Sequence, residues 1–226
     1  MVELLGEFIY FFLHLDVHLS QIIVEYGVWA YLILFLIIFV ETGLVVMPFL
    51  PGDSLLFAAG AFAAPQLSAG GETIPGPFNV FYLMGSLFIA AFLGDTLNYA
   101  IGDYFGPKVF RRDYRFLKRE HLVKTQKFYE RHGAKTIIFA RFIPIIRTFA
   151  PFVAGVGTMK YSRFMSYNII GGFLWVVIFV TAGYFFGNIP AVKKNFTLVI
   201  FAIIIVSVLP PAFEFMKQKL SSKTAS

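Results

Sequence analysis

Residues 139–155 read FARFIPIIRTFAPFVAG, an apolar stretch that contains two arginines, Arg141 and Arg147. In a chain as hydrophobic as this one, we expect such a stretch at membrane depth. A guanidinium group is costly there and does not readily discharge by losing its proton. Two arginines on either side of Pro144 therefore indicate first a site for an anion, and only second a structural role.

The composition of the 226-residue chain is typical of an integral membrane protein. Hydrophobic residues make up 58% and charged residues 14% of the chain, whereas soluble domains contain about 25% charged residues. Cysteine is absent, which excludes disulfides, iron–sulfur clusters and thiolate metal sites. The net charge of +6 is clustered, and in a membrane protein clustered charge indicates topology rather than nucleic-acid binding. We expect a single membrane domain over residues 1–226.

The expected fold is an all-α polytopic membrane protein with two oppositely oriented re-entrant hairpins, further transmembrane helices and an inverted repeat. Glycine and proline break two apolar segments into limbs too short to cross a hydrocarbon core of about 30 Å. The expected organisation is an N-terminal helix at 1–27, a first repeat at 28–106 with a re-entrant hairpin at 28–64, a basic cytoplasmic loop at 107–135, a second repeat at 136–187 with a re-entrant hairpin at 136–157, a last transmembrane helix at 196–213 and a cytoplasmic tail at 214–226.

Basic residues place both the loop at 107–135 and the tail at 214–226 on the cytoplasmic side. Two expected spans, 162–187 and 196–213, separate them, so the two placements agree. The first hairpin then enters from the outer face and the second from the cytoplasmic face. If residues 4–24 also span the bilayer, the N-terminus is cytoplasmic; the alternative is an amphipathic helix that lies along the membrane. We also expect the basic loop to contact anionic lipids.

The two broken segments resemble each other at a constant offset. Glu41 aligns with Arg141 and Pro51 with Pro151, each pair being 100 residues apart. One span lies between the two segments, so the repeats have opposite orientation. Inverted repeats with broken helices that meet near the midplane are typical of transporters.

The first hairpin carries acids where the second carries arginines. If the hairpins meet, Glu41 and Asp53 face Arg141 and Arg147. The structural interpretation is that the acids only neutralise the arginines and fix how the hairpins dock, although desolvation makes a buried pair poor evidence for added stability. The functional interpretation is that the arginines bind phosphate, whose oxygens match the planar guanidinium forks. The acids then exchange a proton when the anion arrives or leaves.

Several further residues are candidates for the lining and the hinges of such a site. Asp95, Asn98 and Thr148 are candidates for lining a cavity, and the alternative for Asp95 is a hydrogen bond to a neighbouring helix. The candidate hinges or helix breaks are Pro48, Pro51, Gly52, Pro144, Pro151 and Gly155.

Other notable residues have ordinary interpretations. We expect the glycine pairs Gly102/Gly106 and Gly183/Gly187 to be close-packing sites rather than ligand sites. Interfacial anchoring and interhelical hydrogen bonds are sufficient explanations for Tyr161, Tyr167, Asn168 and Trp175. The histidines lack metal-ligand spacing, and no nucleophile or phosphate-loop motif is present. The sequence therefore predicts no metal, no cofactor, no catalytic residue and no nucleic-acid partner, and it leaves the oligomeric state open.

The same residues carry a resemblance to the DedA family of bacterial inner-membrane proteins. The matching motifs, spread over most of the chain, are Glu41-Thr-Gly-Leu, Phe49-Leu-Pro-Gly-Asp53-Ser, Gly94-Asp95, and Arg141-Phe-x-Pro144-x-x-Arg147-Thr-x-x-Pro151 followed by Ala154-Gly155. The resemblance implies two opposed re-entrant hairpins, transport of a lipid across the inner membrane and dependence on proton-motive force. It places functional acids at Glu41 and Asp53 and functional arginines at Arg141 and Arg147.

We therefore expect a non-enzymatic inner-membrane translocase of a phosphate-headed lipid, with undecaprenyl phosphate as the expected lipid and protons as the coupling ion. A proton-coupled transporter of a small ion or solute is one alternative, and it needs no sideways opening to lipid. A phospholipid scramblase, a lipid phosphatase and an assembly scaffold are the others; for the phosphatase no placed nucleophile is evident.

Overall fold

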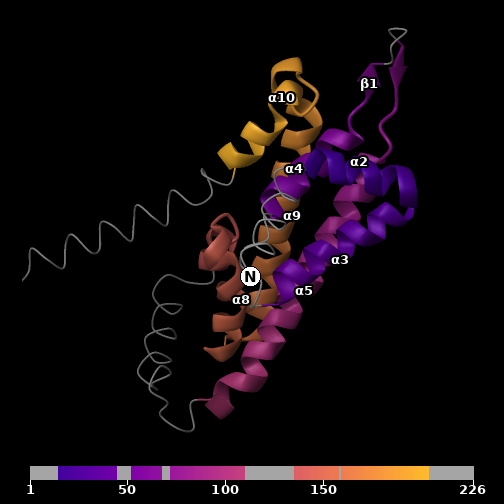
Figure 1. Ribbon diagram of the computed structural model, residues 1–226. Helices are drawn as coiled ribbons and strands as arrows, with labels where there is room; N and C mark the ends of the chain where they lie inside the picture. The colour runs from indigo at the N-terminus through magenta and orange to yellow at the C-terminus, as the bar shows by residue number, and fades with distance from the viewer. Residues whose placement is uncertain (1–14, 45–51, 68–71, 110–134, 158, 204–226) are drawn as a thin grey trace, which may run out of the picture.

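The computed structural model describes residues 15–44, 52–67, 72–109, 135–157 and 159–203. Two long helices, α5 (Val80–Val109) and α9 (Tyr161–Phe186), lie side by side and form the axis of the molecule (Figure 1). Both contain apolar stretches long enough to cross a membrane, at Val80–Gly106 and Tyr161–Phe186. The described chain is mostly helical, which confirms the all-α class. Two of its helices are apolar and long enough to be membrane spans.

Shorter helices surround this axis. They are α2 (Leu15–Tyr26), α3 (Trp29–Gly43), α4 (Gly52–Ala63), α7 (Lys135–Ala140), α8 (Pro144–Val156) and α10 (Pro190–Lys194), and residues 196–203 are also helical. The segment between α4 and α5 contains two short antiparallel strands, β1 (Gln66–Leu67) and β2 (Thr73–Ile74). With 15 and 12 residues, α3 and α4 are about 23 and 18 Å long, less than a hydrocarbon core of about 30 Å.

Helices α3 and α4 approach the axis from the end where α5 begins. At the start of α3, the hydroxyl of Tyr31 accepts a hydrogen bond from the backbone N–H of Asn79 at 2.7 Å. At its end, a Cβ on Gly43 would lie 3.3 Å from the Cα of Gly94, halfway along α5. Helix α4 then runs back, because its last turn meets Gly187 at the end of α9.

Helices α7 and α8 approach from the opposite end. Ile137 in α7 packs with Phe164 in the first turn of α9, and the following turn places Arg141 against Gly172. Helix α8 then returns, because Val156 in its last turn meets Gly106 near the end of α5. The two broken helix pairs, α3 with α4 and α7 with α8, therefore approach the bundle from opposite ends, and the end of α3 meets the starts of α4 and α8 near its middle.

The two glycine pairs are close-packing sites, as the sequence predicts. A Cβ on Gly102 would lie 2.1 Å from the carbonyl oxygen of Phe152 in α8, and a Cβ on Gly183 would lie 1.9 Å from that of Phe57 in α4. A side chain at either position would collide with backbone. Each span therefore has a glycine notch. Helix α8 packs into the notch at Gly102 and Gly106 of α5, and helix α4 packs into the notch at Gly183 and Gly187 of α9.

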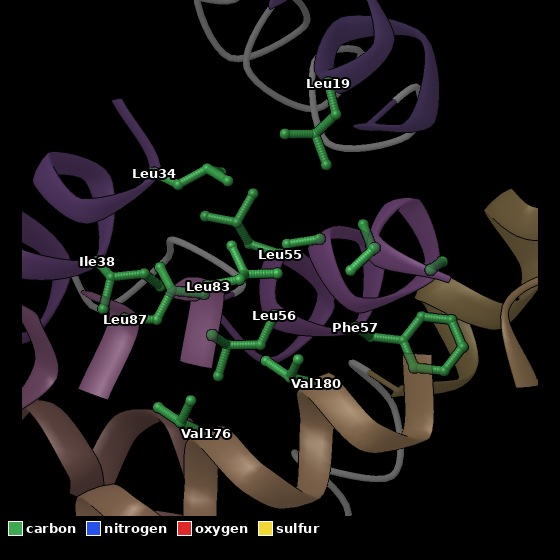
Figure 2. Close-up of a cluster of buried hydrophobic side chains, with 14 of the residues drawn as sticks. Leu19, Leu34, Ile38, Leu55, Leu56, Phe57, Leu83, Leu87, Val176 and Val180 are labelled. Carbon is green, nitrogen blue, oxygen red and sulfur yellow. The ribbon is translucent and has the colours of Figure 1, made fainter. Parts of the chain in front are cut away.

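The main apolar core lies between α3, α4, α5 and α9 (Figure 2). Its fully buried members include Leu34 and Ile38 from α3, Leu56 from α4, and Leu83 and Leu87 from α5. Many large apolar side chains on the outer faces of the spans are exposed, among them Phe81, Tyr82, Ile89, Leu93, Phe173, Ile178 and Phe185. An exposed apolar surface of this extent suits a lipid environment rather than water.

Several sequence predictions fall outside the described residues. They concern Pro48, Pro51, residues 1–14 of the N-terminal helix, most of the basic loop at 107–135, and everything after residue 203. The described part of that loop is helical, because α5 continues to Val109.

Candidate functional site

Arg147 joins the two broken helix pairs. It lies in the first turn of α8, and its Nη2 forms an ion pair with Glu41 near the end of α3. Its Nη1 lies 2.6 Å from Oδ1 of Asp53, in the first turn of α4. All three side chains are buried, with Arg147 only 5% exposed. Helix ends that are far apart in the sequence therefore meet at one guanidinium group.

Glu41 also holds the start of α4. Its Oε1 accepts a hydrogen bond of 3.3 Å from the backbone N–H of Gly52, which satisfies one of the free donors at the N-terminus of that helix. A Cβ on Gly52 would lie 2.1 Å from Oε2 of Glu41, so glycine is needed here for the close approach of a carboxylate. Oε2 itself has no hydrogen-bond partner among the described residues.

Arg141 has different partners from those that the sequence predicts. Its Nη1 lies 2.9 Å from Oδ2 of Asp95 on α5 and donates a 2.7 Å hydrogen bond to Oδ1 of Asn168 on α9. Its Nη2 donates to the carbonyl oxygen of Ala91 at 3.2 Å. The expectation that Glu41 and Asp53 neutralise both arginines is therefore wrong for Arg141.

The physical reason lies in where each arginine falls relative to the helix break. Arg141 belongs to the turn that follows α7 and faces the two long spans. Arg147 is half a dozen residues later, in the first turn of α8, and faces the ends of α3 and α4. Among the described residues, no ion pair joins Arg141 to Glu41 or Asp53.

Trp175 contacts both arginines, and the sequence analysis did not assign it to the site. Its Nε1 donates a hydrogen bond of 2.7 Å to Oδ1 of Asp53. The guanidinium carbon of Arg147 lies 4.7 Å from the ring centroid, and that of Arg141 lies 5.7 Å from it. These distances are those of cation–π contacts.

Of the two explanations given for Trp175, the interhelical hydrogen bond is confirmed by its bond to Asp53 on α4, and interfacial anchoring is wrong because the side chain is completely buried. The available signal was its position, because it lies near the middle of the 26-residue helix α9, where no membrane interface is expected. Asn168 forms the interhelical hydrogen bonds expected for it. Besides its bond to Arg141, its Nδ2 donates to the carbonyl oxygen of Phe92 at 3.2 Å.

Asn98 links the two broken pairs through their backbones. Its Nδ2 donates to the carbonyl oxygen of Thr42 at 3.1 Å and to that of Thr148 at 2.8 Å. Asp95, Asn98 and Thr148 are all buried, and a cavity-lining role for them stays a prediction. The sequence analysis gave a hydrogen bond to a neighbouring helix as the alternative role of Asp95. In the structure, Asp95 instead forms an ion pair with Arg141.

The expected hinges divide into those that begin a helix and those that do not. Gly52 is the first residue of α4, and Pro144 is the first residue of α8. Helix α8 continues through Pro151 and Gly155 to Val156, so neither residue ends it. A Cβ on Gly155 would lie 2.2 Å from the carbonyl oxygen of Tyr99, so this glycine serves close packing on α5.

A cavity of about 450 Å³ lies away from these charges. Its walls come from α2, the last turn of α4 and the segment after α9, and include Gln21, Ala61, Asn188 and Lys193. Asp53 and Ala61 are eight residues apart on α4, or about 12 Å at helical rise. This cavity therefore does not contain the buried acids and arginines described above.

Together these contacts define a helical membrane protein with a buried acid–arginine cluster at the meeting point of two broken helix pairs. Residues 50–185 match the family described as the VTT domain. The chain belongs to the DedA family of membrane proteins.

Three relatives illustrate the membership. The chain is 51% identical to Protein DedA of Escherichia coli strain K12 over 226 residues, which is 100% of both chains. It is 42% identical to an uncharacterized membrane protein of Mycobacterium leprae over 175 residues, covering 77% of this chain and 74% of the relative. It is 33% identical to Inner membrane protein YqjA of Escherichia coli strain K12 over 165 residues, covering 73% and 70%. No solved structure matches the chain.

Proposed function

We propose that the protein is a proton-coupled translocase of a phosphate-headed lipid, with undecaprenyl phosphate as the expected lipid. One observation carries the proposal: two guanidinium groups are buried in the middle of an apolar bundle, each paired with acid from another helix. Arginine forks match phosphate oxygens, and ionisable groups inside a membrane mark substrate and proton pathways more often than structural ones.

The helix arrangement supports alternating access. We interpret α3–α4 and α7–α8 as two re-entrant hairpins of an inverted repeat, because each pair enters from one end of the bundle and returns to that end. The phosphate headgroup of a lipid would then pass between the two hairpins near the midplane while the lipid tail stays in the bilayer. In transporters with broken helices, one repeat rocks against the other around such a site.

The proton has a defined place in this scheme. Glu41, Asp53 and Asp95 stand against Arg141 and Arg147 in the cluster, so three carboxylates and two guanidinium groups leave one excess negative charge when all are ionised. Adding a phosphate increases that excess in a low-dielectric setting, which is costly. Uptake of a proton by one acid compensates, and its release accompanies release of the lipid.

The setting proposed for this activity is the bacterial inner membrane, with the C-terminus in the cytoplasm. The printed name of one relative, Inner membrane protein YqjA, agrees with that location. The protein would act without chemistry on the lipid, and its basic loop would contact anionic lipids.

Reconstitution tests the proposal. Purified protein is placed in liposomes that contain a polyprenyl phosphate, and the exposure of its headgroup in the outer leaflet is followed with and without a pH gradient. We expect headgroup movement that depends on the gradient and that is lost in Arg147→Gln, with Arg163→Gln, an exposed arginine on α9, as the matched control.

Three results would contradict the proposal and indicate another function. Headgroup movement that does not depend on the pH gradient indicates a scramblase. Flux of a small anion without lipid movement indicates a solute transporter. Release of inorganic phosphate from the lipid indicates a phosphatase.

A further inference from the structure

The two buried arginines differ in which guanidinium edge is occupied. In Arg147, Nη1 and Nη2 both contact carboxylates, from Asp53 and Glu41. In Arg141, Nη1 holds Asp95 and Asn168, and Nη2 holds a backbone carbonyl. The Nε of Arg141 is buried and has no hydrogen-bond partner among the described residues.

An unpartnered Nε leaves one edge of the Arg141 guanidinium group open. Nε and Nη2 together form the side of the fork that binds two oxygens of a carboxylate or phosphate in parallel. A buried donor without an acceptor is destabilising, so the position favours an acceptor that arrives from outside the chain. The ion pair with Asp95 uses the other end of the group and need not break.

The local charge also distinguishes the two arginines. Arg147 contacts two carboxylates, and this triad has an excess negative charge when all three groups are ionised. Arg141 contacts one carboxylate, Asp95, and its other partners are neutral. An approaching anion is therefore repelled less at Arg141 than at Arg147.

Trp175 contacts both groups. Its ring lies near both guanidinium groups, and its N–H donates to Oδ1 of Asp53, the same oxygen that pairs with Arg147. The indole is completely buried. The Trp175 hydrogen bond and the ion pair therefore both hold Asp53 at Arg147.

We propose that Arg141 alone receives the lipid phosphate, through its unpartnered Nε, while Arg147 with Glu41 and Asp53 forms the part of the cluster that takes up the proton, and Trp175 contacts both. The inference rests on the proposed function and assigns different tasks to its two arginines. The partnerless Oε2 of Glu41 is the position where the added proton resides. The charged groups that face Glu41 are Arg147 and Asp53, with Asp95 on α5 beyond them.

Trp175 supplies a direct reporter for this assignment. The chain contains two tryptophans, and Trp29, the other one, is 68% exposed at the start of α3. In a Trp29→Phe background, the fluorescence of the full-length protein in a neutral detergent comes from Trp175. Decyl phosphate is the probe, and uncharged decyl maltoside controls for binding of the alkyl chain.

We expect a saturable fluorescence change with decyl phosphate in this background. Arg141→Gln should weaken binding at least about tenfold, which corresponds to about 1.4 kcal/mol, because the variant removes a charge-assisted hydrogen bond to the phosphate. Arg147→Gln should change the affinity less than about threefold but remove its dependence on pH. The exposed Arg163→Gln variant should behave like the background.

Because a buried acid without its cation is costly, paired variants repeat the comparison. Arg141→Gln with Asp95→Asn should fail to bind, and Arg147→Gln with Glu41→Gln should bind. Equal loss of affinity in both series, or greater loss in the Arg147 series, would overturn the assignment and leave lipid-phosphate transport intact. A folded background protein that shows no response to decyl phosphate would overturn the transport proposal as well.

Discussion

The first broken pair, α3 with α4, and the second, α7 with α8, pack on the two long spans in the same way but carry opposite charges. In each, the first limb packs on the long span of its own half, and the returning limb enters the glycine notch of the other half's span. The first pair brings Glu41 and Asp53 to the middle, and the second brings Arg141 and Arg147. The comparison teaches that the two pairs pack on the long spans in the same way while their charges are complementary, so neither pair forms the cluster alone.

The largest effect is expected from filling a notch. In Gly183→Ala the new Cβ would lie 1.9 Å from the carbonyl oxygen of Phe57, and in Gly102→Ala it would lie 2.1 Å from that of Phe152. Because backbone must move in both cases, each variant should lose several kcal/mol, above the usual overpacking cost of about 1–3 kcal/mol. Thermal unfolding in detergent measures the loss.

Gly85 provides the control, because a Cβ there meets nothing within 4 Å. Gly85→Ala should unfold at or slightly above the wild-type temperature, since alanine favours helix by about 1 kcal/mol over glycine. A large loss in one notch variant and none in the other would break the equivalence of the two halves.

The next effect concerns the ion pair between the halves. Arg147→Gln leaves Glu41 and Asp53 without their cation, and removing one partner of a buried pair costs about 3–5 kcal/mol. Adding Glu41→Gln should recover part of that loss, because the two side chains are in contact and contacting residues couple in double-mutant cycles. Chemical or thermal unfolding of the four proteins in the cycle gives the coupling energy.

The same cycle with Glu41→Gln and Arg141→Gln is the matched comparison. These residues form no ion pair among the described contacts, so their coupling should be clearly smaller. Equal coupling in the two cycles would mean that the acids of the first half serve both arginines alike.

A smaller effect is expected at the neutral link between the halves. Asn98→Ala removes the donor that serves the carbonyl oxygens of Thr42 and Thr148. An intramolecular hydrogen bond contributes about 0.5–1.5 kcal/mol net, so losing both should lower the unfolding temperature modestly. Thr96→Ala, on the same helix with a bond only to its own helix backbone, is the control and should lose less.

An effect of similar size should come from Trp175→Phe. This variant keeps an aromatic face over the arginines and loses the N–H bond to Asp53, and an intramolecular hydrogen bond contributes about 0.5–1.5 kcal/mol net, or about 1.5–3 kcal/mol to a charged group. Trp175→Leu also loses the cation–π contacts and should unfold earlier. If both variants unfold alike, the ring does not stabilise the pair of arginines.

The charged residues of the site could be predicted from the sequence because charged residues are rare in apolar stretches. Glu41, Asp53, Arg141 and Arg147 were identified in this way, and all four are buried. Trp175 was not, because an aromatic residue in a chain with 19% aromatic residues carries little signal. Its role depends on which face of α9 turns inward, and packing decides that.

Local chemistry determined which parts of this chain are helical, apolar and interrupted, because composition and the proline and glycine positions act on near neighbours. It also determined that buried charges exist and must be compensated, since their desolvation cost holds in any fold. Only the tertiary structure decided the partners: Arg147 with Glu41 and Asp53, and Arg141 with Asp95. Partner choice depends on how helices distant in the sequence cross and on which face each presents, and that is fixed when the glycine notches, the apolar core and Trp175 pack together.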